Sequence, residues 1–331
     1  MLVSRRNLLR IARETALKSA LSDPGLVAAY LTGSLRSDNP FLGNATDIDI
    51  VLIHASEPKL HREIIPLTPE IHLDIIHNPR SLYDRPKELR VHPWLGPELY
   101  DPMPLHDPQH FFEFIQAGVR DRYDEPDNVQ LRSHHLAEKA RQEWSDLQIG
   151  QPFGPPQVLN YLKSISLAAN AIALLAGIPL AERRFLLQFP ARAQAAGQPG
   201  LTESLWSLLG ANQVEAATLT GFLQEWEKAF TDAAAIPAVD SRIAIARLGY
   251  YKLACESMLG SETPQAAIWP LMLTWTLSVS VLPPAMGDRW RSACAALGLE
   301  DASFDERMEE LDHFLDAVEA GLESLDVSQG L

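Results

Sequence analysis

Apolar positions follow two different periods along the first eighty residues, and the change of period predicts the order of helix and strands. Between residues 4 and 21 they recur every three or four positions, which is typical of an amphipathic helix. Three short apolar runs follow and predict buried strands at residues 26–31, 46–53 and 71–76. Together these segments predict one helix packed against a small sheet.

A second change of pattern predicts a division of the chain. The proline-rich segment 79–108 is expected to be irregular, with a short strand near Glu98-Leu99-Tyr100. From about Asp107 the apolar spacing is helical to the end, with a boundary within residues 121–127, and beyond this boundary it predicts roughly seven or eight helices. We therefore expect an α+β protein with a strand-containing domain, residues 1–121, and an all-α bundle domain, residues 122–331.

The charge distribution restricts the partners. The chain of 331 residues has a formal net charge of -15. Residues 300–331 carry 11 of the 43 acidic side chains and a single basic one. Long nucleic acids need basic surfaces, so we expect no long nucleic acid as partner. A small anion bound through a metal ion remains compatible, because the metal supplies the positive charge.

Cysteine usage and hydropathy point to the cytoplasm. Cys255 and Cys294 lack metal or redox spacing and are expected to be buried free thiols in a reducing compartment. Charged residues interrupt the N-terminal segment, which argues against a signal peptide. The apolar stretch 266–282 contains Pro270 and several hydroxyl residues, so we expect a buried bundle helix and no membrane partner.

Three carboxylates in the predicted strands are the strongest candidates for chemistry. Asp47 and Asp49 lie two apart in one strand and therefore point to the same side, and Asp74 lies in the next predicted strand. The alternative is a solvated strand face. Two or three carboxylates on adjacent strands suit the binding of divalent metal with a nucleotide triphosphate, because two ions can orient the triphosphate and activate an attacking hydroxyl.

Gly33-Ser34 precedes these carboxylates by about a dozen residues. Gly33 permits close approach of the backbone to a phosphate, and Ser34 offers a hydroxyl and a backbone N–H at a helix start, where anions are favoured. Beside this turn, Asp47 and Asp49 would bind the metal ion that carries the nucleotide. Asp74 would complete a second metal site and assist deprotonation of the acceptor hydroxyl. His72 shares the face of Asp74 and could line the site, although a packed or solvated strand histidine is the alternative.

The pattern Gly-Ser, a dozen residues, Asp-Ile-Asp-Ile and a later isolated Asp resembles the DNA polymerase β-like nucleotidyltransferase superfamily. Leu31-Thr32-Gly33-Ser34-Leu35-Arg36 and Thr46-Asp47-Ile48-Asp49 look like its bacterial branch, which includes aminoglycoside and minimal nucleotidyltransferases. The resemblance covers about residues 5–120. It implies a mixed sheet flanked by helices, two Mg2+ ions during catalysis, an NTP donor and a phosphate-binding Arg36. Relatives often carry that Arg one position later, where Ser37 stands here.

The second half resembles more weakly the helical domains of kanamycin-type enzymes. The resemblance implies that Lys163 contacts the triphosphate, and the alternative is an exposed helix lysine. Arg183 and Arg184 could also reach phosphates, although a position on a helix surface is favoured. The acidic C-terminal helix is expected to close the bundle, with a homodimer seam or an acidic wall for a cationic acceptor as alternatives.

These features predict a cytoplasmic, Mg2+-dependent nucleotidyltransferase. It would move NMP from an NTP to a hydroxyl of a small molecule, such as an aminoglycoside-like antibiotic, or of a protein. The alternative is a non-catalytic nucleotide-binding relative that acts as a sensor or as a toxin–antitoxin-type partner. The sequence leaves the acceptor open.

Overall fold

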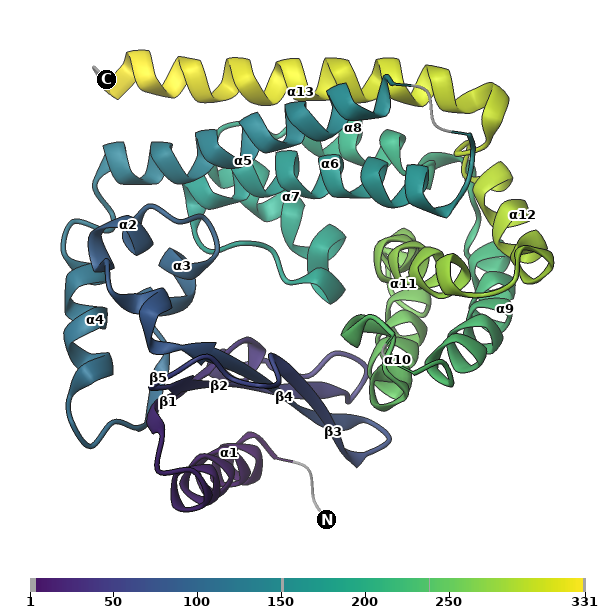
Figure 1. Ribbon diagram of the computed structural model, residues 1–331. Coiled ribbons are helices and arrows are strands. Elements are labelled where there is room, and N and C mark those ends of the chain that lie inside the picture. Colours follow the sequence, from purple (N-terminus) through teal and green to yellow (C-terminus); the bar gives the residue numbers. More distant parts are fainter. Residues whose placement is uncertain (1–3, 150–151, 238, 330–331) are drawn as a thin grey trace. The chain divides into compact units, whose positions relative to one another are not determined.

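The computed structural model describes residues 4–149, 152–237 and 239–329. The chain forms two compact units, of which the first ends at Glu125 and the second begins at Pro126. The first unit contains a five-stranded sheet with helices, and the second is helical (Figure 1). The expected α+β fold class is confirmed.

Helix α1 spans Arg5–Ser22 and confirms the first predicted element. The side chain of Ser4 caps its start by accepting a hydrogen bond from the backbone N–H of Asn7 at 3.3 Å. Leu8, Ala12 and Ala16 recur at intervals of four and are fully buried. This stripe covers one face of the sheet (Figure 1).

The sheet has the strand order β3-β4-β2-β1-β5. Its strands are β1 (Leu26–Thr32), β2 (Thr46–His54), β3 (Arg62–Thr68), β4 (Ile71–Pro79) and β5 (Met103–His106). β2 pairs with β4 in parallel, and the other pairings are antiparallel, so the sheet is mixed. The predicted strands at 26–31, 46–53 and 71–76 are confirmed, each extended by one to three residues at its end.

Two edges of the sheet differ from expectation. Strand β3 had no prediction, because it is an edge strand with exposed or half-buried residues and Pro66, and so it lacks a buried apolar face. The predicted strand at residues 98–100 is wrong, since these residues end helix α3 (Leu95–Tyr100) and the strand β5 begins at Met103. Pro97 lies in the first helical turn, where a missing N–H is tolerated.

The two faces of the sheet contact different helices. Ile48 and Ile50 pack in the core beneath α1, together with Leu73 and Ile75 of β4. The opposite face packs against η2 (Arg80–Tyr83), α2 (Pro86–Arg90), α3 and α4 (Phe111–Arg120) (Figure 1). Because side chains alternate, odd-numbered residues of β2 and even-numbered residues of β4 belong to this second face.

In the described part of the second unit we find nine α-helices, somewhat more than expected. They are α5 (Pro126–Leu147), α6 (Pro155–Ala173), α7 (Phe185–Ala195), α8 (Leu201–Leu208), α9 (Ala216–Ala234), α10 (Leu248–Leu259), α11 (Ile268–Val281), α12 (Asp288–Ala296) and α13 (Asp301–Gln329). Residues 268–279 of α11 are all buried, as the sequence predicted for this apolar stretch. Among described residues, the single helix with the length and apolarity of a membrane span is Pro155–Ala176, and 72% of its apolar window is buried in the protein.

Helix α13 closes the bundle and uses its acidic side chains inside the second unit. It packs along α5 and α8 (Figure 1), with Leu311, Val318 and Leu322 fully buried. Arg141 of α5 forms ion pairs at 2.5–2.8 Å with three carboxylates of this helix, those of Asp312, Asp316 and Glu319. The bundle-closing interpretation of this acidic helix is therefore confirmed.

Both cysteines are buried free thiols, as expected. Burial raises the pKa of Cys255 to about 12 from an ordinary 9.0, and it raises that of Cys294 as well. We predict that the folded protein reacts with a thiol-specific disulfide reagent about a thousandfold more slowly than an exposed thiol does, because the thiolate fraction falls tenfold per pKa unit. Absorbance of the released thiolate measures this rate, and fast labelling before unfolding would contradict the prediction.

Candidate functional site

Parallel pairing of β2 with β4 brings the predicted carboxylates onto one face of the sheet. Asp47 pairs with His72, and Asp49 pairs with Asp74. All four belong to the face opposite α1, because their strand neighbours Ile48 and Leu73 pack beneath that helix. The fold therefore places three acidic side chains and one imidazole on adjacent strands.

A tight group within this set has the composition of a metal site. One potential ligand atom from each of Asp47, His72 and Asp74 lies within 4.8 Å of the other two. The three residues are 7%, 0% and 1% exposed. Two carboxylates and an imidazole at this spacing can bind a divalent ion with modest movement, since metal–oxygen and metal–nitrogen bonds are about 2.0–2.2 Å long. The sequence had named His72 only as a residue that could line the site.

Asp49 is not a member of that group among the described residues, and its carboxylate lies against Gly33. Gly33 has φ of +72°, and a Cβ built there would be 1.8 Å from Asp49 Oδ2. The glycine therefore provides space for the carboxylate as well as the left-handed backbone that the turn requires. Approach of a phosphate to Gly33 stays a prediction.

Ser34 begins a single 3-10 turn, η1 (Ser34–Arg36), directly beside the first carboxylate. Its hydroxyl lies 3.2 Å from Thr46 Oγ1 and donates to Asp47 Oδ1 at 3.4 Å, a long hydrogen bond. Thr46 in turn donates to the carbonyl of Pro40 at 3.1 Å. This chain of hydroxyls holds the turn against the start of β2, so the Gly-Ser turn and the carboxylate strand form one local structure.

Asp74 has a partner that sequence patterns did not indicate. Arg62 of β3 donates from Nε and Nη2 to the two oxygens of Asp74, at 2.7 and 2.6 Å. Such a bidentate pair orients the carboxylate and compensates its charge. A carboxylate has about four acceptor positions, so an oxygen already bonded to Arg62 can still bind a cation. The sequence did not predict this ion pair, because β3 lacks an apolar pattern and was not expected to be a strand.

Arg36 is engaged within the first unit. Its guanidinium pairs with Asp101 at 2.5 Å, and Arg120 contacts the same carboxylate at 3.3 Å. Asp101 directly follows helix α3. To bind phosphate, Arg36 would have to leave Asp101 and pair with the ligand instead.

The predicted basic residues of the second unit have different surroundings. Lys163 on α6 pairs with Glu143 at 2.6 Å, and its side chain is 58% exposed. Its contact with a triphosphate stays a prediction. The helix-surface interpretation of Arg183 is wrong, since this residue is 3% exposed and its guanidinium lies 3.6 Å above the ring centre of Tyr250. It also donates to the Tyr250 carbonyl, so Arg183 supports the core.

A buried polar network lies on the same face of the sheet as the carboxylates. Tyr30 of β1 donates to Glu98 at 2.5 Å and contacts the hydroxyl of Tyr83 at 3.2 Å, while Asn78 donates to Tyr83 at 2.9 Å. Burial raises the pKa of Glu98 above 4.5, which the Tyr30 hydrogen bond partly offsets. It also raises the pKa of Tyr83 to about 12.

We predict that Glu98→Gln becomes progressively more stable than the wild type as pH rises. A carboxyl whose folded-state pKa is raised stabilises the fold in its protonated form below the unfolded pKa, and this contribution is lost as pH rises through the folded pKa. Gln mimics the protonated form at every pH. Urea unfolding between pH 4 and pH 8 measures the difference, and a constant or falling difference would contradict the prediction.

Comparisons with known proteins do not assign the chain to a family by its sequence. No family model and no curated protein matches the chain. Among solved structures, the chain is similar to a nucleotidyltransferase-like protein from Exiguobacterium sibiricum, with a TM-score of 0.30 and 10% identity over 98% of this chain and 92% of that one. Similarity at this level carries no argument about activity, so function has to be argued from the site itself.

Proposed function

We propose that the chain is a metal-dependent nucleotidyltransferase that moves NMP from an NTP to a hydroxyl of a small molecule or a protein. The observation that supports this most is the arrangement on β2 and β4. Asp47, Asp49 and Asp74 share one face there, with the Gly33-Ser34 turn packed against Asp47 and Asp49. The metal would be Mg2+, with two ions during catalysis. We expect an aminoglycoside-like antibiotic among the acceptors.

The residues present fit a divalent ion, since Asp47, His72 and Asp74 already bring three ligand atoms together. When bound, the metal supplies charge compensation for the triphosphate and lowers the pKa of the attacking hydroxyl. Asp47 and Asp49 would hold it from one strand, and Asp74 from the next. The backbone of Gly33 and the hydroxyl of Ser34 would bind phosphate oxygens beside them.

The proposed reaction is an in-line displacement at the α-phosphorus. The acceptor oxygen forms a bond to that phosphorus, and the bond to the bridging oxygen breaks, so pyrophosphate leaves with the electron pair. Asp74 accepts the proton from the acceptor hydroxyl. Arg62, at 2.6–2.7 Å from Asp74, would orient this carboxylate toward the acceptor.

The ion pair between Arg62 and Asp74 also favours a second candidate function. A carboxylate compensated by an arginine needs no metal, which is compatible with a non-catalytic nucleotide sensor or a toxin–antitoxin-type partner. The two candidates differ in one product. We expect the wild type to release pyrophosphate from an NTP in the presence of Mg2+ and a panel of hydroxyl acceptors. Nucleotide binding without any pyrophosphate would support the sensor instead.

A direct test of the proposed site is nucleotide-dependent thermal stabilisation. We expect ATP with Mg2+ to raise the melting temperature of the wild type and to leave that of Asp49→Ala unchanged. Ligand binding to the folded state alone stabilises by about 2.7 kcal/mol at 100 times Kd. If no NTP shifts the melting temperature, or if Asp49→Ala responds as the wild type does, the proposal fails.

The imidazole in the group leads to a prediction about metal preference. Nitrogen ligands favour Mn2+, Co2+ and Zn2+ over Mg2+, which prefers oxygen. Because His72 lies beside Asp47 in the β2–β4 register, we expect His72→Asn to reduce Mn2+ affinity about tenfold or more and Mg2+ affinity less. Titration calorimetry with each metal measures both constants. Equal losses for the two metals, or no loss, would show that His72 is not a ligand.

A further inference from the structure

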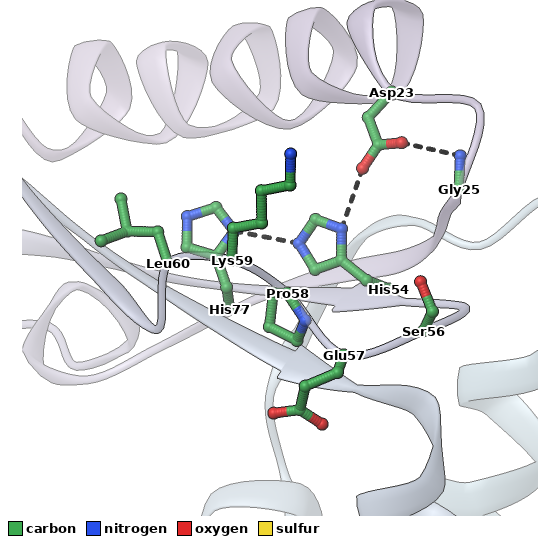
Figure 2. A pocket seen from close by; sticks show the side chains of 9 residues that line it. All are labelled: Asp23, Gly25, His54, Ser56, Glu57, Pro58, Lys59, Leu60 and His77. Carbon is green, nitrogen blue, oxygen red and sulfur yellow. Dashed lines mark hydrogen bonds and ion pairs between the residues drawn. The ribbon is translucent and has the colours of Figure 1, made fainter.

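A chain of four polar side chains lies at the other ends of β2 and β4, away from the carboxylates. His54 Nδ1 lies 2.9 Å from Asp23 Oδ2, His54 Nε2 lies 2.9 Å from His77 Nδ1, and His77 Nε2 lies 2.8 Å from Glu63 Oε1. Both histidines project toward the α1 side of the sheet and line a pocket of about 250 Å³ (Figure 2). Nothing in the proposed transfer reaction uses these residues.

The two rings meet edge to edge in an orientation suited to a hydrogen bond. Their planes are inclined by 23° and their centroids are 5.1 Å apart. Since a ring nitrogen lies about 1.1 Å from its ring centre, a nitrogen separation of 2.9 Å with this centroid distance requires the rings to be nearly in line. Each inner nitrogen therefore points at the other, and a proton must lie between them, because two lone pairs would repel.

Counting protons gives the charge of the pair. Ionised carboxylates only accept hydrogen bonds, so His54 donates to Asp23 and His77 donates to Glu63. The central hydrogen bond needs a third proton, whereas two neutral imidazoles carry only two. We propose that His54 and His77 share one additional proton, as an imidazole–imidazolium pair between Asp23 and Glu63, and that this pair makes the stability of the first unit depend on pH.

The surroundings can support such a pair. One positive charge lies between two carboxylates, and the backbone N–H of Gly25 donates to Asp23 at 2.8 Å and so fixes that carboxylate. The other charged groups that line the pocket are Glu57 and Lys59, one of each sign, from the loop after β2 (Figure 2). The Lys59 side chain lies on the side of the rings and the Glu57 carboxylate is directed away from them, so Lys59 opposes the added positive charge and the carboxylates of Asp23 and Glu63 have to outweigh it.

The pair connects four elements of the first unit. Asp23 follows α1, His54 ends β2, His77 lies in β4 and Glu63 lies in β3. Loss of the shared proton breaks one of the three hydrogen bonds and loosens the ends of these strands. The folded state thus holds about one proton more than an unfolded chain whose histidines are neutral, so stability falls as pH rises. The unfolding equilibrium constant is expected to rise by up to about tenfold per pH unit over this range.

The test compares urea unfolding of the wild type and of His54→Gln from pH 7 to pH 9, where the histidines of an unfolded chain are mostly neutral, with His61→Gln as the matched control. His61 is exposed and lies in the same region. We expect the wild type to lose its advantage over His54→Gln as pH rises, while His61→Gln follows the wild type. A pH-independent difference between the wild type and His54→Gln would overturn the proposal.

Nitrogen NMR of the imidazoles in the wild type provides a test without any variant. We expect the combined shifts of the His54 and His77 rings to show one imidazolium charge at pH 7.5, above the ordinary range of a free imidazole. Two neutral rings at this pH would overturn the proposal. A rise in melting temperature with Zn2+ that His54→Gln abolishes would overturn it as well, because a metal ion would then occupy the position assigned to the proton.

Discussion

Asp47→Asn is expected to weaken the binding of Mn2+–ATP by at least about 100-fold, which corresponds to about 2.7 kcal/mol. Asp47 contributes an anionic oxygen to the group with His72 and Asp74, whose ligand atoms lie within 4.8 Å. Asn keeps the shape of the side chain and removes its charge. Because Asp47 is only 7% exposed, water screens this charge weakly, and its loss removes much of the electrostatic stabilisation of the metal. Titration calorimetry with a non-hydrolysable ATP analogue measures the affinity.

The matched control is Asp38→Asn, which removes an exposed carboxylate from the loop between β1 and β2. Its net charge change is the same, so it reports any long-range effect of charge. We expect its affinity to remain within about twofold of the wild type, because exposed charges are screened by salt. Equal affinities for Asp47→Asn and the wild type would contradict the assignment of the metal site.

Gly33→Ala is expected to slow NMP transfer by about 100-fold while the protein remains folded. The new Cβ would lie 1.8 Å from Asp49 Oδ2, so the carboxylate has to move by more than 1 Å. A displacement of that size at a reacting group costs roughly 100-fold in rate. With φ of +72° and ψ of -164°, Gly33 adopts a backbone conformation that is essentially restricted to glycine, so alanine adds a stability cost of about 1–3 kcal/mol. Initial rates of pyrophosphate release and urea unfolding measure the two effects separately.

Gly197→Ala separates backbone strain from collision. Gly197 has φ of +73°, nearly the value at Gly33, and a Cβ built there meets nothing within 4 Å. We therefore expect an unchanged rate of transfer and a smaller loss of stability than at Gly33, where ψ of -164° adds backbone strain for alanine and the Cβ meets Asp49. If Gly33→Ala retains the wild-type rate, Asp49 does not take part in the reaction in the proposed way.

Local patterns predicted the central part of the fold. Helix α1 and strands β1, β2 and β4 follow from apolar period and burial, since each has a continuous buried face. The common face of Asp47 and Asp49 follows from strand geometry alone. The superfamily resemblance added the expectation of a mixed sheet, which is confirmed by the parallel pairing of β2 with β4.

What the sequence did not predict depends on which strands pair and in which register. Arg62 contacts Asp74 because the edge strand β3 folds back on β4, and neither residue carries a local signal for the other. His72 joins Asp47 only through the β2–β4 register. The helix at residues 95–100 was missed because prolines surround it, although Pro97 lies in the first turn, where it is tolerated.

The most direct measurement is a crystal structure with Mn2+ and an ATP analogue that has a methylene group between the α- and β-phosphorus atoms. We expect an anomalous scattering peak that identifies Mn2+ in contact with Asp47 and Asp74, with the triphosphate beside Gly33 and Ser34. A structure at saturating ligand in which no metal contacts Asp47 or Asp74 and the nucleotide lies away from Gly33 and Ser34 would contradict the account.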